Sequence, residues 1–190
     1  MQLSRWLRSA ALMLLASPLG AAVLPEDRAD MLYHRYDGGG MVIQGPSVLV
    51  RKGFEGRVSV SAGYYVDQVS AASVDVIASA SPYEEERKEK SVGVDYLVGK
   101  AIYSLSYTRS SENDYEARTV NFGASQDFFG DLTTLSFGYG RGDDTVRRSD
   151  DPFFEEDASR QHFRFGLTQV LTRNMMAAVS HEFISDEGYL

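Results

Sequence analysis

The chain has 190 residues, a formal net charge of −8 at pH 7 and no cysteine. That length allows one domain with a sizeable core, and the negative charge argues against a nucleic-acid partner. The lack of cysteine excludes disulfides, thiolate metal ligands and cysteine nucleophiles. With 11 Tyr and 10 Phe against a single Trp, the aromatic residues suit β-strands and a lipid interface.

Residues 1–22 have the pattern of a secretory signal peptide. Arg5 and Arg8 precede a short apolar core at residues 10–16, and small residues at 20–22 predict cleavage just before Val23. The apolar core is too short to span a bilayer as a helix, although an uncleaved anchor is the alternative. No long apolar run follows. An exported, β-rich chain of this kind is either soluble in the periplasm or a barrel in the outer membrane.

Alternation of apolar and small polar residues predicts strands along most of the remaining chain, because successive side chains of a strand point to opposite faces. In chain order the predicted strands are 30–36, 41–52, 57–69, 91–98, 101–109, 120–126, 135–139, 161–171 and a last one beginning at Met175. Pro46 lies in the second of them, which suggests an edge position or a bulge.

The hairpin within residues 117–141 shows this alternation most clearly. Val120, Phe122 and Ala124 lie on one face of its first strand, and residues 128–131 form the turn. A water-soluble sheet usually presents charged side chains to solvent, whereas the face opposite the aromatics here is Ser, Gly, Asn and Thr. This composition is typical of a strand with lipid outside and a crowded, wet lumen inside.

The predicted connections alternate between short and long. The short ones are 53–56, 98–100, 128–131 and 172–174, and the long ones are 70–89, 110–116 and 142–159. We expect the charge run at 83–90 and the acidic segment 142–159 to be solvated loops. Short periplasmic turns and long outer loops characterise outer-membrane barrels. The sequence therefore predicts an all-β, antiparallel up-and-down transmembrane β-barrel over residues 23–190.

The predicted strands number about nine, whereas bacterial single-chain barrels have even strand numbers. The polar segment 184–190 does not form a last strand that ends in an aromatic residue. Nine strands alone would leave two unpaired edges in lipid. We therefore expect the barrel domain to be C-terminally truncated, as part of a larger barrel.

Several long segments carry a resemblance to a known family. They include LPEDRADMLYHRYDGGG, ASPYEEERKEKSVGVDYL and SQDFFGDLTTLSFGYGRGDDTVRR, and the similarity runs from Leu24 to the terminal DEGYL. These segments resemble a family of exported Gram-negative proteins that is classified only as a domain of unknown function and is similar to outer-membrane β-barrels. The resemblance implies a barrel that continues past Leu190, with no assigned activity or catalytic residues. It also hints at a role in envelope redox chemistry or protein maturation, which the residues themselves do not show.

Carboxylates gather in the predicted outer loop at 142–159. They are Asp143, Asp144, Asp150, Asp151, Glu155, Glu156 and Asp157. Ca²⁺ takes several carboxylate oxygens, but this spacing does not match the EF-hand pattern. Arginines are also interspersed among the acids. A solvated, self-paired loop is therefore favoured over a Ca²⁺ site or a divalent-bridged contact with lipopolysaccharide, and we expect no metal and no cofactor.

Five charged residues share the register of the small polar residues, and we expect them to face the lumen. They are Asp67, Asp95, Asp127, Arg164 and Glu182. Such charges either tune ion selectivity or pair across strands and stabilise the barrel.

The three histidines do not predict an active site. His34 lies in the weak first strand and His181 on the lipid-facing register, so the only pairing to be drawn is His162 with Asp143 or Asp144. Loop positions alone do not establish the roles that identify a catalytic site. We therefore expect no enzymatic activity.

The sequence thus predicts a porin-like protein of the outer membrane, in contact with its lipid and lipopolysaccharide. It would act as a pore or as a barrel component of a redox or maturation system with periplasmic protein partners. One alternative is a non-conducting structural or assembly partner in the outer membrane. Another is a soluble periplasmic ligand-binding barrel, in which the apolar face would point inward.

Overall fold

The computed structural model describes residues 22–39, 41–71, 83–148 and 151–189. These residues form one antiparallel sheet of nine strands, in which each strand pairs with its neighbours in sequence. The strands are β1 (Arg28–Gly38), β2 (Met41–Phe54), β3 (Val58–Ala71), β4 (Tyr83–Val98), β5 (Ala101–Ser111), β6 (Tyr115–Phe128), β7 (Thr133–Arg148), β8 (Asp151–Thr172) and β9 (Met175–Gly188). The predicted all-β, up-and-down fold and its nine strands are confirmed. Residues 1–21 of the predicted signal peptide lie outside the described residues.

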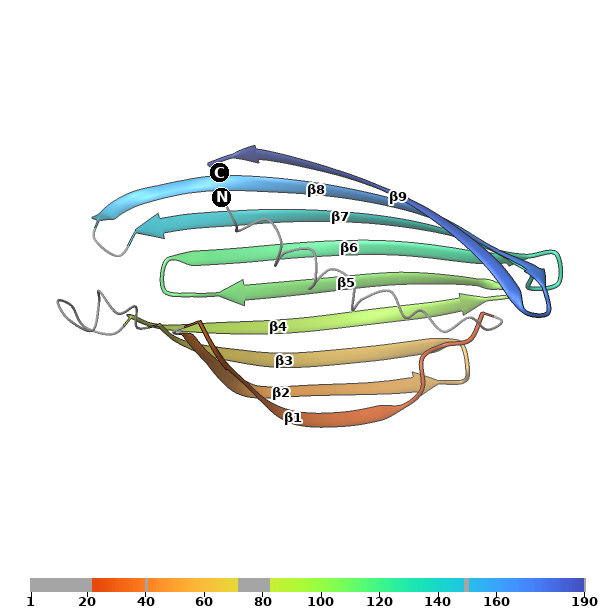
Figure 1. Ribbon diagram of the computed structural model, residues 1–190, viewed down its shortest axis with the longest axis horizontal. Helices are drawn as coiled ribbons and strands as arrows, with labels where there is room; N and C mark the ends of the chain where they lie inside the picture. The colour runs from red at the N-terminus through yellow and green to blue at the C-terminus, as the bar shows by residue number, and fades with distance from the viewer. Residues whose placement is uncertain (1–21, 40, 72–82, 149–150, 190) are drawn as a thin grey trace.

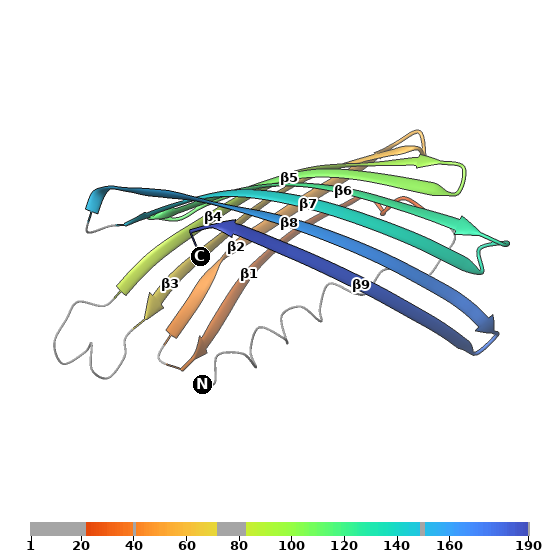
Figure 2. The same ribbon diagram turned by 90° about the horizontal axis from the view of Figure 1, so that it is seen from above.

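The sheet is strongly curved. Figure 1 shows the nine strands lying side by side in chain order, and Figure 2 shows the sheet bent into a trough with β1 and β9 at its two borders. Within the described residues β1 and β9 do not pair with each other, so the sheet is not closed. The curvature gives it a concave face and a convex face.

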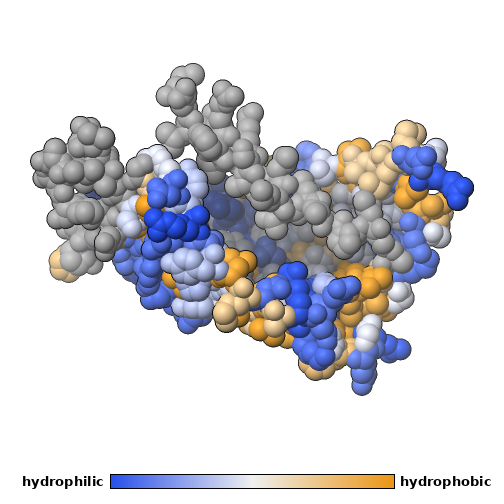
Figure 3. Space-filling view, turned by 60° about the horizontal axis from the view of Figure 1, so that its bottom comes forward, coloured by the Kyte–Doolittle hydropathy of each residue, from blue (hydrophilic) through white to orange (hydrophobic). Residues whose placement is uncertain are grey.

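The two faces differ in chemistry because the register keeps like residues in rows. Phe122, Tyr139, Phe163 and Phe183 follow one another directly across β6, β7, β8 and β9. On β5 the convex Leu105 is 56% exposed, whereas its concave-face neighbours are partly buried. Hydrophilic residues are visible inside the hollow of the trough in Figure 3. The convex face therefore carries the large apolar side chains and the concave face the small and polar ones.

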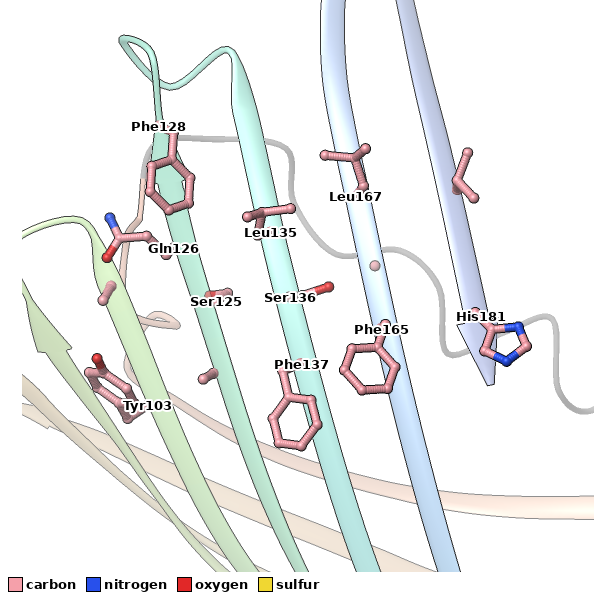
Figure 4. A pocket seen from close by; sticks show the side chains of 14 residues that line it. Tyr103, Ser125, Gln126, Phe128, Leu135, Ser136, Phe137, Phe165, Leu167 and His181 are labelled. Atoms are coloured by element: carbon pink, nitrogen blue, oxygen red, sulfur yellow. The ribbon is translucent and has the colours of Figure 1, made fainter. Parts of the chain in front are cut away.

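A belt of exposed apolar side chains crosses the convex face, and we call it the apolar belt. Its members on β4 to β9 include Val92, Val94, Tyr96, Val98, Tyr103, Leu105, Tyr107, Val120, Phe122, Leu135, Phe165, Leu167, Val179 and Phe183. A shallow apolar groove of about 550 Å³ lies within it. Figure 4 shows the rings of Tyr103, Phe137 and Phe165 standing along this groove.

The short turns have the backbone that their sequences require. β6 ends at Phe128, and the next three residues, Phe129, Gly130 and Asp131, all have positive φ angles between 52° and 69°. Gly99 has φ of 60° in the turn between β4 and β5. These left-handed conformations reverse the chain within a few residues, as the sequence predicts for both positions.

The predicted long loops, in contrast, are largely wrong. β4 begins at Tyr83, so the charge run 83–90 is part of a strand. β7 continues to Arg148 and β8 begins at Asp151, so most of the segment 142–159 is also strand. The connection between β5 and β6 shrinks to residues 112–114, and β9 extends to Gly188 beyond its predicted apolar part. Residues 72–82 of the predicted connection 70–89 lie outside the described residues. Among the described connections, the predicted alternation of short and long is not observed.

These extensions are held by ladder pairing, by ion pairs and, at the start of β8, by an aromatic contact between Phe154 and Tyr189, whose ring centroids lie 5.3 Å apart. On β4 Lys88 pairs with Glu86, and Arg87 pairs with Glu89 at 2.9 Å. Across β7 and β8, Arg147 Nε donates to Glu155 Oε2 at 2.8 Å. The extended strands raise the outer hairpins beyond the apolar belt, where both faces can be charged. No helix in the described residues is long and apolar enough to cross a membrane.

Candidate functional site on the concave face

The structure places the five charges predicted for the lumen on the concave face, but in separate clusters. Asp67 lies on β3 and faces toward β1. Asp95 lies in the middle of β4, and Arg164 and Glu182 lie on β8 and β9. Asp127 is 6% exposed at the end of β6, where its carboxylate accepts a hydrogen bond from Thr134 Oγ1 at 2.6 Å. Asp127 therefore fixes the hairpin end and is not open to a solute.

The middle of the concave face is built around Asp95. Arg51 Nη1 on β2 donates to Asp95 Oδ2 at 3.1 Å, and Ser104 Oγ on β5 donates to Asp95 Oδ1 at 2.6 Å. Arg51 crosses β3 to make this contact, and it can do so because β3 presents only Ser59 and Ser61 at these positions. The Arg51 and Asp95 side chains are 18% and 19% exposed. The result is a bound pair of opposite charges that still reaches the hollow.

A second cluster joins β1 and β3 and was not predicted from the sequence. His34 Nε2 lies 2.7 Å from Asp67 Oδ1 and 3.2 Å from Tyr65 Oη. The His34 and Tyr65 rings stack with centroids 4.9 Å apart. Gly45 lies between them on β2, and its missing side chain leaves the path across that strand open. Gly45 was visible in the sequence, but its position between His34 and Asp67 was not.

Pro46 suggested that its strand would lie at an edge of the sheet or contain a bulge, and the structure shows an interruption of the pairing at this residue. β2 lies between β1 and β3 and is not an edge strand. Its pairing with β3 is interrupted between the pairs Gln44 with Gln68 and Ser47 with Tyr65. Pro46 lies in that gap, where its missing N–H leaves no ladder bond unmade.

The third cluster lines a cavity of about 330 Å³ toward the outer ends of β4 to β8. Arg87 Nε donates to Ser110 Oγ at 3.0 Å, and Arg160 Nε donates to Asp186 Oδ1 at 2.8 Å. The Tyr115 hydroxyl donates to Asp144. Burial and this hydrogen bond raise the pKa of Tyr115 to about 12. Tyr115 therefore stays a neutral donor, and the cavity presents cations and carboxylates close together.

The predicted acidic loop does not exist as one cluster, because its residues alternate between the two faces. Asp143 pairs with Arg141 on the convex face, whereas Asp144 faces the cavity. Glu155 pairs with Arg147 and Asp157 accepts from Thr145, while Glu156 lies opposite Val146 and Asp151 opposite Arg148. Asp150 lies outside the described residues. Within the described part of the chain, no three carboxylates or histidines converge as metal ligands.

The acidic contact of His162 is Glu182 and not Asp143 or Asp144. His162 Nε2 lies 2.5 Å from Glu182 Oε1, and Arg164 Nη2 lies 3.5 Å from the same oxygen. The register explains this result, because β8 pairs directly with β9 at Arg164 and Glu182. The concave face therefore holds paired charges, which suit contact with ions and hydrated solutes.

Two carboxyl groups beyond the apolar belt allow a test by pH. Burial raises the pKa of Glu112, whereas a hydrogen bond from Arg118 lowers the pKa of Glu116. A raised carboxyl pKa costs stability once the pH exceeds the unfolded value, and a lowered one contributes stability there. We expect Glu112→Gln to raise the melting temperature at about pH 7 and Glu116→Gln to lower it. The Glu112 difference should vanish as the pH falls to about 4, whereas the Glu116 difference should be lost only at lower pH, as the pH falls through the lowered pKa of Glu116. Shifts of the same sign in the two variants would contradict this assignment.

An antiparallel up-and-down sheet with an apolar convex face and a polar concave face is the fold of outer-membrane β-barrels. Among solved structures, OmpT, an outer membrane protein of Vibrio cholerae in its trimer form, is similar, with a TM-score of 0.55 and 15% identity. The match covers 83% of this chain and 54% of the OmpT chain, so this chain spans about half the length of OmpT. That likeness shows the fold alone.

The chain belongs to the family described as protein of unknown function (DUF3570), whose model matches residues 15–190. The resemblance drawn from the sequence is therefore confirmed. A comparison with curated proteins found no match.

Proposed function

We propose that this chain forms the wall of a barrel in the outer membrane and that its concave face lines a water-filled passage for ions or small hydrated solutes. The observation that carries the proposal is the division between the faces. Exposed large apolar side chains occupy the convex belt, while Arg51, Asp95, Arg87 and Arg160 face the hollow. A barrel that binds an apolar ligand inside would need the opposite arrangement. The proposal includes no catalytic role, because the concave clusters are paired charges without an activated nucleophile.

Single-channel recording of the full-length protein in planar bilayers tests this function. We expect discrete conductance steps, because a concave face of small side chains leaves room for water. Folding would be checked on the same sample by the electrophoretic mobility shift between heated and unheated protein. A folded barrel that stays silent would contradict the pore and favour a structural or assembly role.

The pair formed by Arg51 and Asp95 predicts how selectivity should change. Removing one member leaves the other charge uncompensated in the passage, so Arg51→Gln should increase preference for cations and Asp95→Asn should decrease it. The reversal potential in a salt gradient measures both changes. Asp131→Asn, at an exposed turn where Asp131 pairs with Lys100, is a matched control for loss of one carboxylate and should leave the reversal potential unchanged. Equal shifts for all three variants would contradict a pathway past Asp95.

A further inference from the structure

A row of cations runs along the convex face at the outer border of the apolar belt. Lys90 on β4 lies directly opposite Arg109 on β5, and Arg109 lies directly opposite Arg118 on β6. On β7 the residue directly opposite Arg118 is Asp143, and Arg141 lies two positions further along, opposite Val120. We call these four cations the basic row. They stand together on a chain whose formal net charge is −8.

Like charges directly opposite each other on neighbouring strands destabilise a sheet. The protein compensates the basic row only in part. Glu116 Oε1 lies 2.9 Å from Arg109 and 2.7 Å from Arg118, and Asp143 lies 3.3 Å from Arg141. Lys90 makes no ion pair with any described residue. Asp143, Asp157 and Glu187 line a hollow beside Arg118. The excess positive charge therefore lies at the end of the row formed by Lys90 and Arg109, where an external anion can neutralise it.

The geometry of the side chains favours an anion that approaches from outside the sheet. Arg109 and Arg118 are 52% and 59% exposed, whereas the Glu116 carboxylate between them is only 16% exposed. The two guanidinium groups are therefore closer to solvent than the Glu116 carboxylate that pairs with both of them. Glu116 Oε1 accepts from Nε and Nη2 of Arg118 and lies 2.9 Å from Nη2 of Arg109, so each exposed guanidinium keeps further N–H groups for an external anion. Together with Lys90 on the adjacent strand, these N–H groups suit the oxygens of phosphate.

The place of the basic row points to a lipid as the source of that phosphate. On each strand, the next convex-face residue toward the short turns is an apolar or aromatic one. Val92 follows Lys90, Tyr107 follows Arg109, Val120 follows Arg118 and Tyr139 follows Arg141. The row therefore lies where the hydrocarbon region meets the outer headgroups. Ala124, which lines the apolar groove, lies six positions along β6 from Arg118. At a tilt of about 45° that is about 14 Å in depth, close to one leaflet of a core about 30 Å thick.

We propose that the basic row binds the phosphates of lipopolysaccharide in the outer leaflet, with the acyl chains lying against the apolar belt below it. Lys90, Arg109, Arg118 and Arg141 hold the phosphorylated headgroup, and Glu116 orients the two central arginines. The inference rests on the membrane placement proposed above, although it does not depend on conduction.

Binding of fluorescent lipopolysaccharide to the purified, folded protein in detergent tests this site. The triple variant K90Q/R109Q/R118Q should bind about a hundredfold more weakly, because each basic residue near an anionic lipid surface changes affinity about fivefold. The triple variant K52Q/K100Q/R173Q removes the same charge at the opposite ends of the strands and should bind as the original protein does. Glu116→Gln should strengthen binding, which a merely structural effect would not do.

Two further arms separate the sources of phosphate. Dephosphorylated lipopolysaccharide should not compete, and phosphatidylglycerol vesicles should compete weakly. Equal competition by phosphatidylglycerol, or unchanged binding by K90Q/R109Q/R118Q, would overturn the proposal. The heat-dependent mobility shift and retention in membranes after carbonate washing are read on the same samples. Their loss in the original protein would reject the membrane placement, whereas their presence without lipopolysaccharide binding would reject the basic row alone.

Discussion

Replacing Leu105 with arginine is expected to destabilise the folded protein in a bilayer by about 2–4 kcal/mol, because the convex face of β5 would carry a charge into the hydrocarbon. Leu105 is 56% exposed and lies within the apolar belt. In a water-soluble sheet an exposed leucine would accept arginine at little cost. The large effect is therefore specific to a face covered by lipid. Urea unfolding of the protein in liposomes, followed by electrophoretic mobility, measures it.

Ser106→Arg is the matched control for this substitution. Ser106 is the next residue of β5 and points to the concave face, where its nearest cross-strand neighbour on β4 is Gly93. An arginine there extends over a glycine into the hollow. We expect a change below about 1 kcal/mol, as for a surface substitution. Equal destabilisation by Leu105→Arg and Ser106→Arg would contradict the assignment of lipid to the convex face.

Gly45→Ala is expected to destabilise the protein by about 3 kcal/mol, at the upper end of the cost of overpacking. A Cβ at Gly45 would lie 1.9 Å from the carbonyl oxygen of Val66 and 2.8 Å from its carbon. These are backbone atoms, so β2 and β3 must move apart to relieve the overlap. The same movement would break the contact between His34 and Asp67. Urea unfolding under the same conditions gives the free energy.

Gly138→Ala provides the comparison for this second prediction. The added Cβ would lie 3.6 Å from the Cβ of Arg164, which is ordinary van der Waals contact. Because alanine also loses less conformational entropy than glycine on folding, we expect no loss of stability, or a gain of up to about 1 kcal/mol. A cost for Gly138→Ala as large as that for Gly45→Ala would contradict the role given to the close approach at Val66.

The parts of the fold that were predictable are those where only one face of a strand is apolar. Within the belt, the alternation of Val120, Phe122 and Ala124 with small polar residues gives both the strand and its orientation. Beyond the belt both faces are wet, so the apolar period disappears while the strand continues. Lys88 faces outward and Arg87 inward in the segment 83–90, and such a segment has the composition of a loop.

The concave clusters could be predicted only in part, for a related reason. The alternation along each strand assigns Asp67 and Asp95 to the same face of the sheet. It does not identify the side chains two strands away that will contact these carboxylates. The contact of His34 with Asp67 depends on Gly45, and that of Arg51 with Asp95 depends on Ser59 and Ser61. These contacts follow from the order of the strands in space. Alternation along a single strand does not contain that information.

Cysteine scanning along β5 tests the central claim most directly, because the chain has no cysteine of its own. Single cysteines at positions 103–108 of the protein in liposomes would be exposed to a charged, membrane-impermeant maleimide. We predict labelling at Ser104, Ser106 and Thr108 and protection at Tyr103, Leu105 and Tyr107. Uniform labelling of all six positions, or protection of the serines with labelling of the aromatics, would contradict a barrel wall with lipid on its convex face and water on its concave face.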